Sequence, residues 1–180
     1  RATGPPLYAS NLWPEQPAGF RSAAEEYWRA CRGLADELLA RRDDLFTTMT
    51  HEAAKTWAEA DVEINEAVDF ARWYADRSIE LERVDGATFT PLGVIAVIPP
   101  WNFPVAIPAG GALASLAAGN AVVLKPASGT PRCAEIIAEA CWAAGVPADV
   151  LRFVRTPDHD VGRRLVTSAD GVILTGSHET

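Results

Sequence analysis

The sequence contains few of the residues that build disulfide frameworks and metal centres. Its 180 residues include only three cysteines and three histidines. The cysteines are odd in number and widely spaced, which excludes a disulfide framework and a thiolate metal cluster. The histidines are isolated in polar segments without metal-ligand spacing, so we expect surface residues and no metal site. These residues are Cys31, Cys133, Cys141, His51, His159 and His178.

The cysteines also lack the setting of a catalytic nucleophile. Cys133 and Cys141 share one helical face with Ile136, Ile137 and Ala140, and Cys31 lies on a similar apolar stripe. A reactive thiolate is expected instead at an exposed, electropositive turn. The spacing therefore predicts three core cysteines.

Positive charge is scarce, and one long segment has no charge at all. The formal net charge is −8, and no segment is basic and amphipathic, so we expect neither nucleic-acid binding nor a membrane surface. Residues 86–124 contain no charged residue, but five prolines and two asparagines divide them into pieces too short for a membrane span. No targeting segment is visible, although the first residue is Arg rather than Met, so a cytoplasmic location is expected.

The sequence also lacks the G-x-G-x-x-G motif, the common dinucleotide-binding fingerprint. What is present is a change of pattern near residue 92. Residues 1–20 form a Pro- and Gly-rich arm, followed by helical patterning. From Leu92 apolar strands alternate with helices, which predicts a parallel, right-handed, doubly wound sheet. The predicted helices span about 22–40, 43–52, 54–82, 105–118, 131–144 and 159–167, and the strands about 92–98, 121–125, 150–154 and 171–175.

The fold class is therefore α/β, with N-terminal helices followed by a doubly wound parallel sheet. We divide the chain into an arm and helical segment at 1–90 and the βα units at 91–180. The last residues, 176–180, read as the start of a helix whose remaining turns are needed to cover the sheet. We therefore expect the N-terminal part of a longer protein, truncated in its nucleotide-binding domain and without a catalytic domain.

Three motifs carry a family resemblance. They are PWNFP at 100–104, GNAVVLKPAS at 119–128 and ILTGSHE at 173–179. In this combination the chain resembles the aldehyde dehydrogenase superfamily, which also normally lacks G-x-G-x-x-G. The resemblance implies a Rossmann-like domain for NAD, with NADP possible, and an aldehyde substrate. It also implies a cysteine thiolate that adds to the aldehyde, hydride transfer to the nicotinamide, and a glutamate that activates water.

Asn102 is the one member of that machinery within these residues. By resemblance, its side-chain amide would donate to the oxygen of the thiohemiacetal formed when the cysteine attacks the aldehyde. The alternative is an asparagine that hydrogen-bonds its own turn. We expect the nucleophilic cysteine and the general-base glutamate beyond Thr180, so the chain alone should be inactive.

The remaining candidate cofactor residues also follow predicted strands. By resemblance, Lys125 would hydrogen-bond the adenosine ribose; the alternative is a solvated strand-end lysine. Ser128 stands where many family members have a glutamate that disfavours NADP, so we expect tolerance of both cofactors with NAD preferred. Discrimination against NADP above about a thousandfold, about 4 kcal/mol, would refute this. Gly176 and Ser177 open a helix that suits a pyrophosphate, although such a pair is usually only a turn and N-cap. Pro100 and Trp101 would shape the cofactor cleft.

Glu66 is the candidate substrate residue. Apolar residues flank it at helical spacing, and a charge in an apolar stripe should have a partner or a purpose. The segment INEAVDFARWYA at 64–75 resembles the subgroup that oxidises L-glutamate γ-semialdehyde, the open form of 1-pyrroline-5-carboxylate. In such an enzyme Glu66 would receive the substrate's α-ammonium. The alternatives are an exposed glutamate or one paired with an arginine such as Arg72.

The resulting interpretation is the cofactor-binding part of an NAD(P)-dependent aldehyde dehydrogenase. Two alternatives remain: a non-catalytic nucleotide-binding or assembly module, and a dehydrogenase for another aliphatic semialdehyde. The resemblance further implies a homo-oligomer in the full-length protein. Proline-catabolic members can be fused to a proline dehydrogenase domain, so an upstream partner domain stays open.

Overall fold

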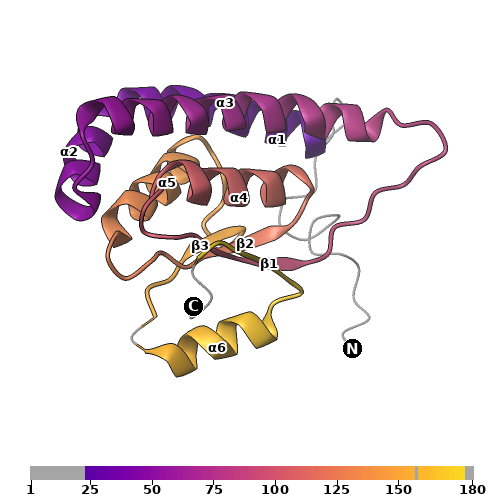
Figure 1. Ribbon diagram of the computed structural model, residues 1–180. Coiled ribbons are helices and arrows are strands. Elements are labelled where there is room, and N and C mark those ends of the chain that lie inside the picture. Colours follow the sequence, from indigo (N-terminus) through magenta and orange to yellow (C-terminus); the bar gives the residue numbers. More distant parts are fainter. Residues whose placement is uncertain (1–22, 157, 177–180) are drawn as a thin grey trace.

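A four-stranded parallel sheet forms the centre of the molecule, between helices on both faces (Figure 1). The computed structural model describes residues 23–156 and 158–176. The strands are β1 (Val94–Ile98), β2 (Ala121–Leu124), β3 (Leu151–Phe153) and β4 (Gly171–Leu174), in the order β3-β2-β1-β4. Helices α4 (Ala106–Ala117) and α5 (Pro131–Ala143) cover one face, and α6 (His159–Ser168) lies on the other. The predicted α/β class with a doubly wound sheet is confirmed.

A second helical layer lies outside α4 and α5 (Figure 1). It consists of α1 (Ala23–Ala40), α2 (Arg42–Ala53) and α3 (Trp57–Glu82). The buried apolar residues of this layer, of α4 and α5, and of the sheet form one continuous core. All three cysteines are buried, which confirms that they are core residues.

The helix ends follow local capping rules. Thr56 and Glu59 form a capping box that begins α3, so this helix starts three residues later than predicted. Pro131 opens α5, and Gly145 follows its end with a φ of +103°, as expected from their positions in the sequence. The sequence of α3 predicts an inward-facing stripe at three- and four-residue spacing, formed by Trp57, Ala60, Ile64, Ala67, Ala71, Tyr74 and Ser78. This stripe is buried at Ala60, Ile64, Ala67, Ala71 and Ser78. The prediction is wrong at Trp57, which is 73% exposed at the first position of the helix.

Strand β1 begins at Val94 rather than Leu92 because two polar side chains hold the preceding backbone. The buried Asn120 Oδ1 accepts hydrogen bonds from Leu92 N at 2.7 Å and Gly93 N at 3.1 Å. Asp170 Oδ2 accepts from Val94 N at 2.8 Å. Gly93 has a φ of +126°, and a Cβ there would lie 2.2 Å from Asp170 Oδ2, so only glycine fits.

The charge-free segment is explained by the position of α4, which packs between the sheet and α3. A Cβ on Gly111 would lie 2.9 Å from Val97 Cγ1, and one on Gly110 would lie 3.1 Å from Phe70 Cε2. Small residues therefore let α4 approach both layers closely. Across the described part of the chain, no helix combines the length and apolar character needed to span a bilayer.

Candidate functional site

The carboxyl ends of the strands meet along one edge of the sheet. Val97 pairs with Leu124, and Ile98 pairs with Leu174, so the loops after β1, β2 and β4 leave the sheet side by side. From β1 the chain winds through β2 to β3 on one side, and β4 then lies on the other side of β1. Ligands of open α/β sheets bind beyond the carboxyl ends at such a reversal. This edge, next to β1 and β4, is therefore the candidate site.

Most of the predicted site residues lie along this edge. The loop after β1 contains Pro100, Trp101 and Asn102. Lys125 continues β2, because its backbone N–H donates to Val97 O at 2.9 Å, and Ser128 lies exposed three residues further on. Gly176 follows Thr175, whose N–H donates to Ile98 O at 3.1 Å. Ser177 and His178 lie outside the described residues.

Asn102 has an unengaged side chain on a loop that is fixed at both ends. It is exposed, and no hydrogen bond or ion pair with the described residues involves its amide. Its neighbours Trp101 and Phe103 are 61% and 44% exposed, whereas Pro99 and Pro104 are buried. The alternative in which Asn102 hydrogen-bonds its own turn is not what the structure shows. The amide is available to a ligand.

A buried glutamate from α3 holds the start of the helix that follows Asn102. Glu63 is only 1% exposed, and its Oε2 accepts hydrogen bonds from Val105 N at 3.0 Å and Ala106 N at 3.1 Å. Its Oε1 lies 2.6 Å from Lys55 Nζ. That ammonium is also 4.4 Å from the centroid of the Phe103 ring. The carboxylate therefore has the partners that a buried charge requires.

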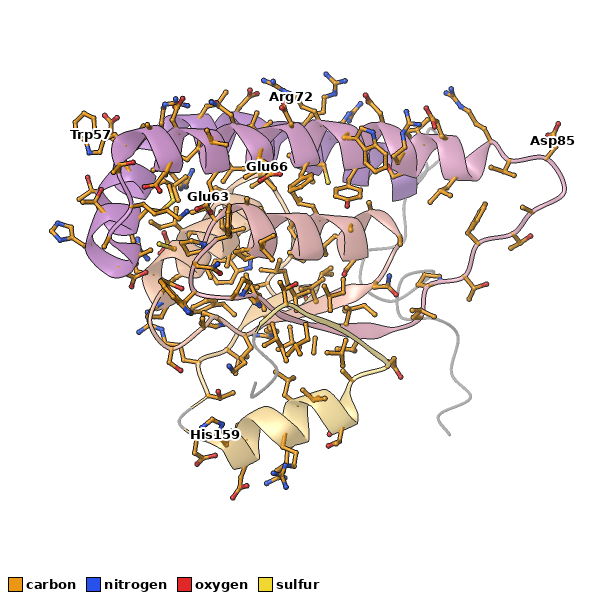
Figure 2. All side chains as sticks on the ribbon, viewed as in Figure 1. Trp57, Glu63, Glu66, Arg72, Asp85 and His159 are labelled. Atoms are coloured by element: carbon orange, nitrogen blue, oxygen red, sulfur yellow. The ribbon has the colours of Figure 1, made fainter. Side chains whose placement is uncertain are left out.

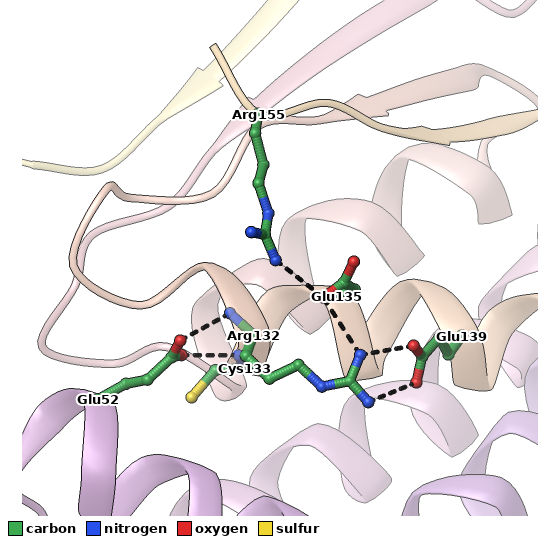
Figure 3. A network of polar contacts seen from close by, with 6 residues as sticks. All are labelled: Glu52, Arg132, Cys133, Glu135, Glu139 and Arg155. Carbon is green, nitrogen blue, oxygen red and sulfur yellow. Dashed lines mark hydrogen bonds and ion pairs between the residues drawn. The ribbon is translucent and has the colours of Figure 1, made fainter. Parts of the chain in front are cut away.

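A second glutamate does the same for α5, as Figure 3 shows. Glu52 Oε1 accepts from Arg132 N and Oε2 accepts from Cys133 N, both at 2.9 Å. The sequence alone would predict a solvated face for the acidic residues Asp43, Asp44 and Glu52, and these contacts show that this prediction is wrong for Glu52. Its carboxylate points at the N-terminus of a helix, where the dipole and the unpaired N–H groups favour negative charge.

Helix α6 is capped within its own chain segment, because Asp158 Oδ1 accepts from Val161 N at 2.8 Å. Protein carboxylates thus occupy the N-termini of α4, α5 and α6, all of which begin at this edge. A ligand phosphate cannot bind these amides without displacing a carboxylate.

The arginines nearest to this edge are matched by carboxylates (Figure 3). Arg132 pairs with Glu139 through both terminal nitrogens, at 2.5 and 3.1 Å, and with Glu135 at 3.2 Å. The hydrogen bond to Glu139 is the main cause that raises the pKa of Arg132. Arg155 donates to Glu135 at 2.9 Å. This cluster offers little net positive charge to a ligand phosphate.

Glu66 lies exposed on α3, and the apolar stripe that singled it out is not a buried one. Val62 is 63% exposed and Trp73 is 55% exposed, so the expectation of a carboxylate enclosed by apolar residues is wrong. Figure 2 shows Glu66 on the side of α3 that faces α4, and Arg72 on the outer side. Among the described residues, Glu66 has no ion-pair partner. Its carboxylate is therefore free to meet a solute.

Sequence reasoning missed Glu63, Lys55 and Glu52. A signal for Glu63 was available, because it lies three residues after Ala60 and four before Ala67, on the buried stripe of α3. Glu52 and Lys55 carried no such signal, since Glu52 bonds to the distant Arg132 and Cys133, and Lys55 contacts the distant Phe103 as well as Glu63. No group of His, Cys, Asp and Glu in the described ranges could hold a metal ion. His51 and His159 are exposed, as expected.

Comparison with known proteins relates the whole arrangement to one family. The model of the aldehyde dehydrogenase family matches residues 16–180. A 1-pyrroline-5-carboxylate dehydrogenase from Geobacillus sp. (strain WCH70) is 44% identical over 70% of this chain and 26% of its own length. A putative succinate-semialdehyde dehydrogenase [NADP(+)] from Mycolicibacterium smegmatis is 34% identical over 96% of this chain and 34% of its own.

A solved structure gives the same relation in three dimensions. Proline Utilization A (PutA) from Corynebacterium freiburgense superposes with a TM-score of 0.83 at 46% identity, over 92% of this chain and 17% of that one. The chain thus spans between about a quarter and a third of the two curated relatives named above.

Proposed function

Because the chain belongs to the aldehyde dehydrogenase family, we propose that it forms the cofactor-binding part of an NAD(P)-dependent enzyme that oxidises an aldehyde to the carboxylate. The observation that carries the proposal is the exposed, unengaged amide of Asn102 beside the reversal point of the sheet. The cysteine nucleophile and the general-base glutamate of the family belong to the part of the enzyme outside this sequence. On this proposal the chain by itself is inactive.

The edge of the sheet suits a dinucleotide. Lys125 would hydrogen-bond the ribose hydroxyls of the adenosine at the end of β2, with Ser128 beside it. Gly176 and Ser177 would bind the pyrophosphate. Protein carboxylates already occupy the N-termini of α4, α5 and α6, which supports this assignment. Pro100 and Trp101 would border the nicotinamide half. When bound, the cofactor supplies the acceptor for the hydride that leaves the substrate carbon.

Ser128 carries no charge, so it does not repel a 2′-phosphate as a glutamate would. The neighbouring arginines do not attract one strongly either, because Glu135 and Glu139 pair with them. Both features support tolerance of NAD and NADP with NAD preferred.

Asn102 would act on the oxygen of the substrate. When a thiolate adds to an aldehyde, negative charge develops on the former carbonyl oxygen. A neutral amide donor stabilises that charge without its own proton transfer, and loss of one such donor typically lowers kcat by about 10²–10³. Because Asn102 has no partner among the described residues, no hydrogen bond to them must break before it donates.

The best supported substrate is L-glutamate γ-semialdehyde. The Geobacillus relative is a 1-pyrroline-5-carboxylate dehydrogenase, and Glu66 supplies a free carboxylate for an α-ammonium group. Another aliphatic semialdehyde is the competing substrate, which the Mycolicibacterium relative favours. Succinate semialdehyde has no ammonium group, so the two differ in the use they make of Glu66. As the family resemblance implies, the full-length protein would be a homo-oligomer.

The full-length gene product with Asn102→Ala tests this proposal. We expect oxidation of glutamate semialdehyde with NAD by the wild type, and a kcat lower by about 10²–10³ in the variant. Asn65→Ala is the matched control, because Asn65 is an exposed asparagine on α3 that contacts Arg42 and Asp61. An Asn102→Ala enzyme with the kcat of the control would refute the role of Asn102.

A further inference from the structure

Asn102 is not held by its own side chain, so its position must be set through its neighbours. The loop containing it has two anchors after Asn102: the ring of Phe103 and the first amides of α4. Both anchors lead to the same ion pair, Lys55 with Glu63, in the outer helical layer. Stabilisation of α4 would require only the hydrogen bonds to Glu63. Lys55 makes no hydrogen bond to the N-terminus of α4 among the described residues, so its contact with Phe103 is not explained by helix stability alone.

The ion pair is built to be rigid. Glu63 is 1% exposed and the Lys55 side chain 13%, so water screens little of their attraction. All the partners come from separate segments: Glu63 from α3, Lys55 from the α2–α3 connection, and Phe103 with Val105 from the β1–α4 loop. Movement of the loop would break the hydrogen bonds that the backbone amides donate to the buried Glu63 carboxylate. The negative charge of this carboxylate would then be poorly compensated.

We propose that Glu63 and Lys55 are positioning residues that fix the Asn102 amide for the reaction. Glu63 holds the backbone at Val105 and Ala106, and the Lys55 ammonium holds the ring of Phe103, which directly follows Asn102 in the chain. Neither residue touches the substrate. The inference rests on the proposed function of Asn102, and it adds a reason why the helical layer is required for chemistry at the sheet edge.

The chain contains a matched control. Glu52 makes the same pair of amide hydrogen bonds at the start of α5, but α5 follows the loop after β2, not the Asn102 loop. Glu52→Gln and Glu63→Gln each remove the negative charge from a glutamate that caps a helix, although Glu63 is also buried and paired with Lys55. If Glu63 only stabilises the fold, the two variants should have similar effects on kcat.

The test measures both the loop and the reaction in the full-length protein. We expect Glu63→Gln to speed hydrogen exchange at the amides of Val105 and Ala106, and Glu52→Gln to speed it at Arg132 and Cys133 instead. We expect Glu63→Gln to lower kcat by about 10- to 100-fold, since a shift of about 1 Å at a reacting group can cost about a hundredfold. Glu52→Gln should keep kcat within about twofold at saturating cofactor. Phe103→Leu, which removes the ring under the Lys55 ammonium but leaves the buried Glu63–Lys55 ion pair intact, is the milder variant should Glu63→Gln fail to fold, and should lower kcat in the same direction.

A double variant separates this inference from the proposed function. In an Asn102→Ala background, Glu63→Gln should lower kcat by less than about threefold further, because both substitutions remove the same donor. Multiplicative effects, or equal kcat values in Glu63→Gln and Glu52→Gln, would overturn the positioning role. A full kcat in Asn102→Ala would instead refute the proposed role of Asn102, while the exchange comparison would still show whether Glu63 holds the loop.

Discussion

Asn120 should be among the costliest polar residues of this fold to remove. Its buried side chain makes three hydrogen bonds: Oδ1 accepts from Leu92 N and Gly93 N, and Nδ2 donates to Ser115 O at 3.0 Å. Ser115 O keeps a second donor in the Asn120 backbone N–H, also at 3.0 Å. The cost of Asn120→Ala therefore falls mainly on the two amides ahead of β1.

The size of the effect follows from these groups. A buried polar group left without a partner costs about 1–3 kcal/mol. Water reaches the N–H group of the exposed Leu92 more easily than that of Gly93. We therefore expect Asn120→Ala to lower the free energy of unfolding by about 2–3 kcal/mol in total. At a urea dependence of about 2 kcal/mol per molar, the unfolding midpoint should fall by about 1 M.

Urea unfolding followed by far-UV circular dichroism measures this shift. Asn65→Ala again provides the comparison, because its two hydrogen bonds are exposed and should be worth less than about 0.5 kcal/mol. Equal midpoints for the two variants would show that the contacts of Asn120 do not determine the position of β1, and would refute the reasoning from burial.

Two further predictions concern other side chains. Burial raises the pKa of the Cys133 and Cys141 thiols well above 9.0, so they should react with a thiol reagent at pH 8 only after denaturant is added. Because the unfolded thiols lose their protons first, the free energy of unfolding should fall above about pH 9, by at most about 1.4 kcal/mol per pH unit for each thiol; fast labelling of the native protein would contradict both statements. Glu66→Gln should raise KM for glutamate semialdehyde about tenfold with little change for succinate semialdehyde, and an unchanged KM for the amino-acid aldehyde would rule out an ammonium contact.

The order of helices and strands could be predicted from the sequence because each element carries a local signal. The apolar runs at 94–98 and 121–124 are long enough for buried strands, and Pro131 with Gly145 marks both ends of α5. The edge of the sheet that carries the candidate site could be predicted as well, since Asn102 and Lys125 lie in the loops that follow two of these runs. What failed were features that depend on which helix face is covered.

Helix α3 shows why. Apolar residues occur on two of its sides, so spacing alone did not decide which side packs inward. The pattern around Val62 and Trp73 pointed to Glu66, whereas the buried carboxylate is Glu63. Two of its three partners are backbone amides at the start of another helix, and a backbone amide has no residue type that a sequence could reveal. The pairing of Glu52 with α5 was hidden for the same reason.

The two glutamate caps also bear on the order in which the protein folds. Glu63 is 42 residues from Val105, and Glu52 is 80 residues from Arg132, so both contacts close long chain segments. Contacts of such separation form late and slowly compared with local helical structure. The outer helices precede the sheet along the chain, so during synthesis they emerge first and can present both carboxylates before α4 and α5 exist. The outer layer of α1, α2 and α3 would then bind the N-termini of α4 and α5 as these helices form, and would so determine where they pack.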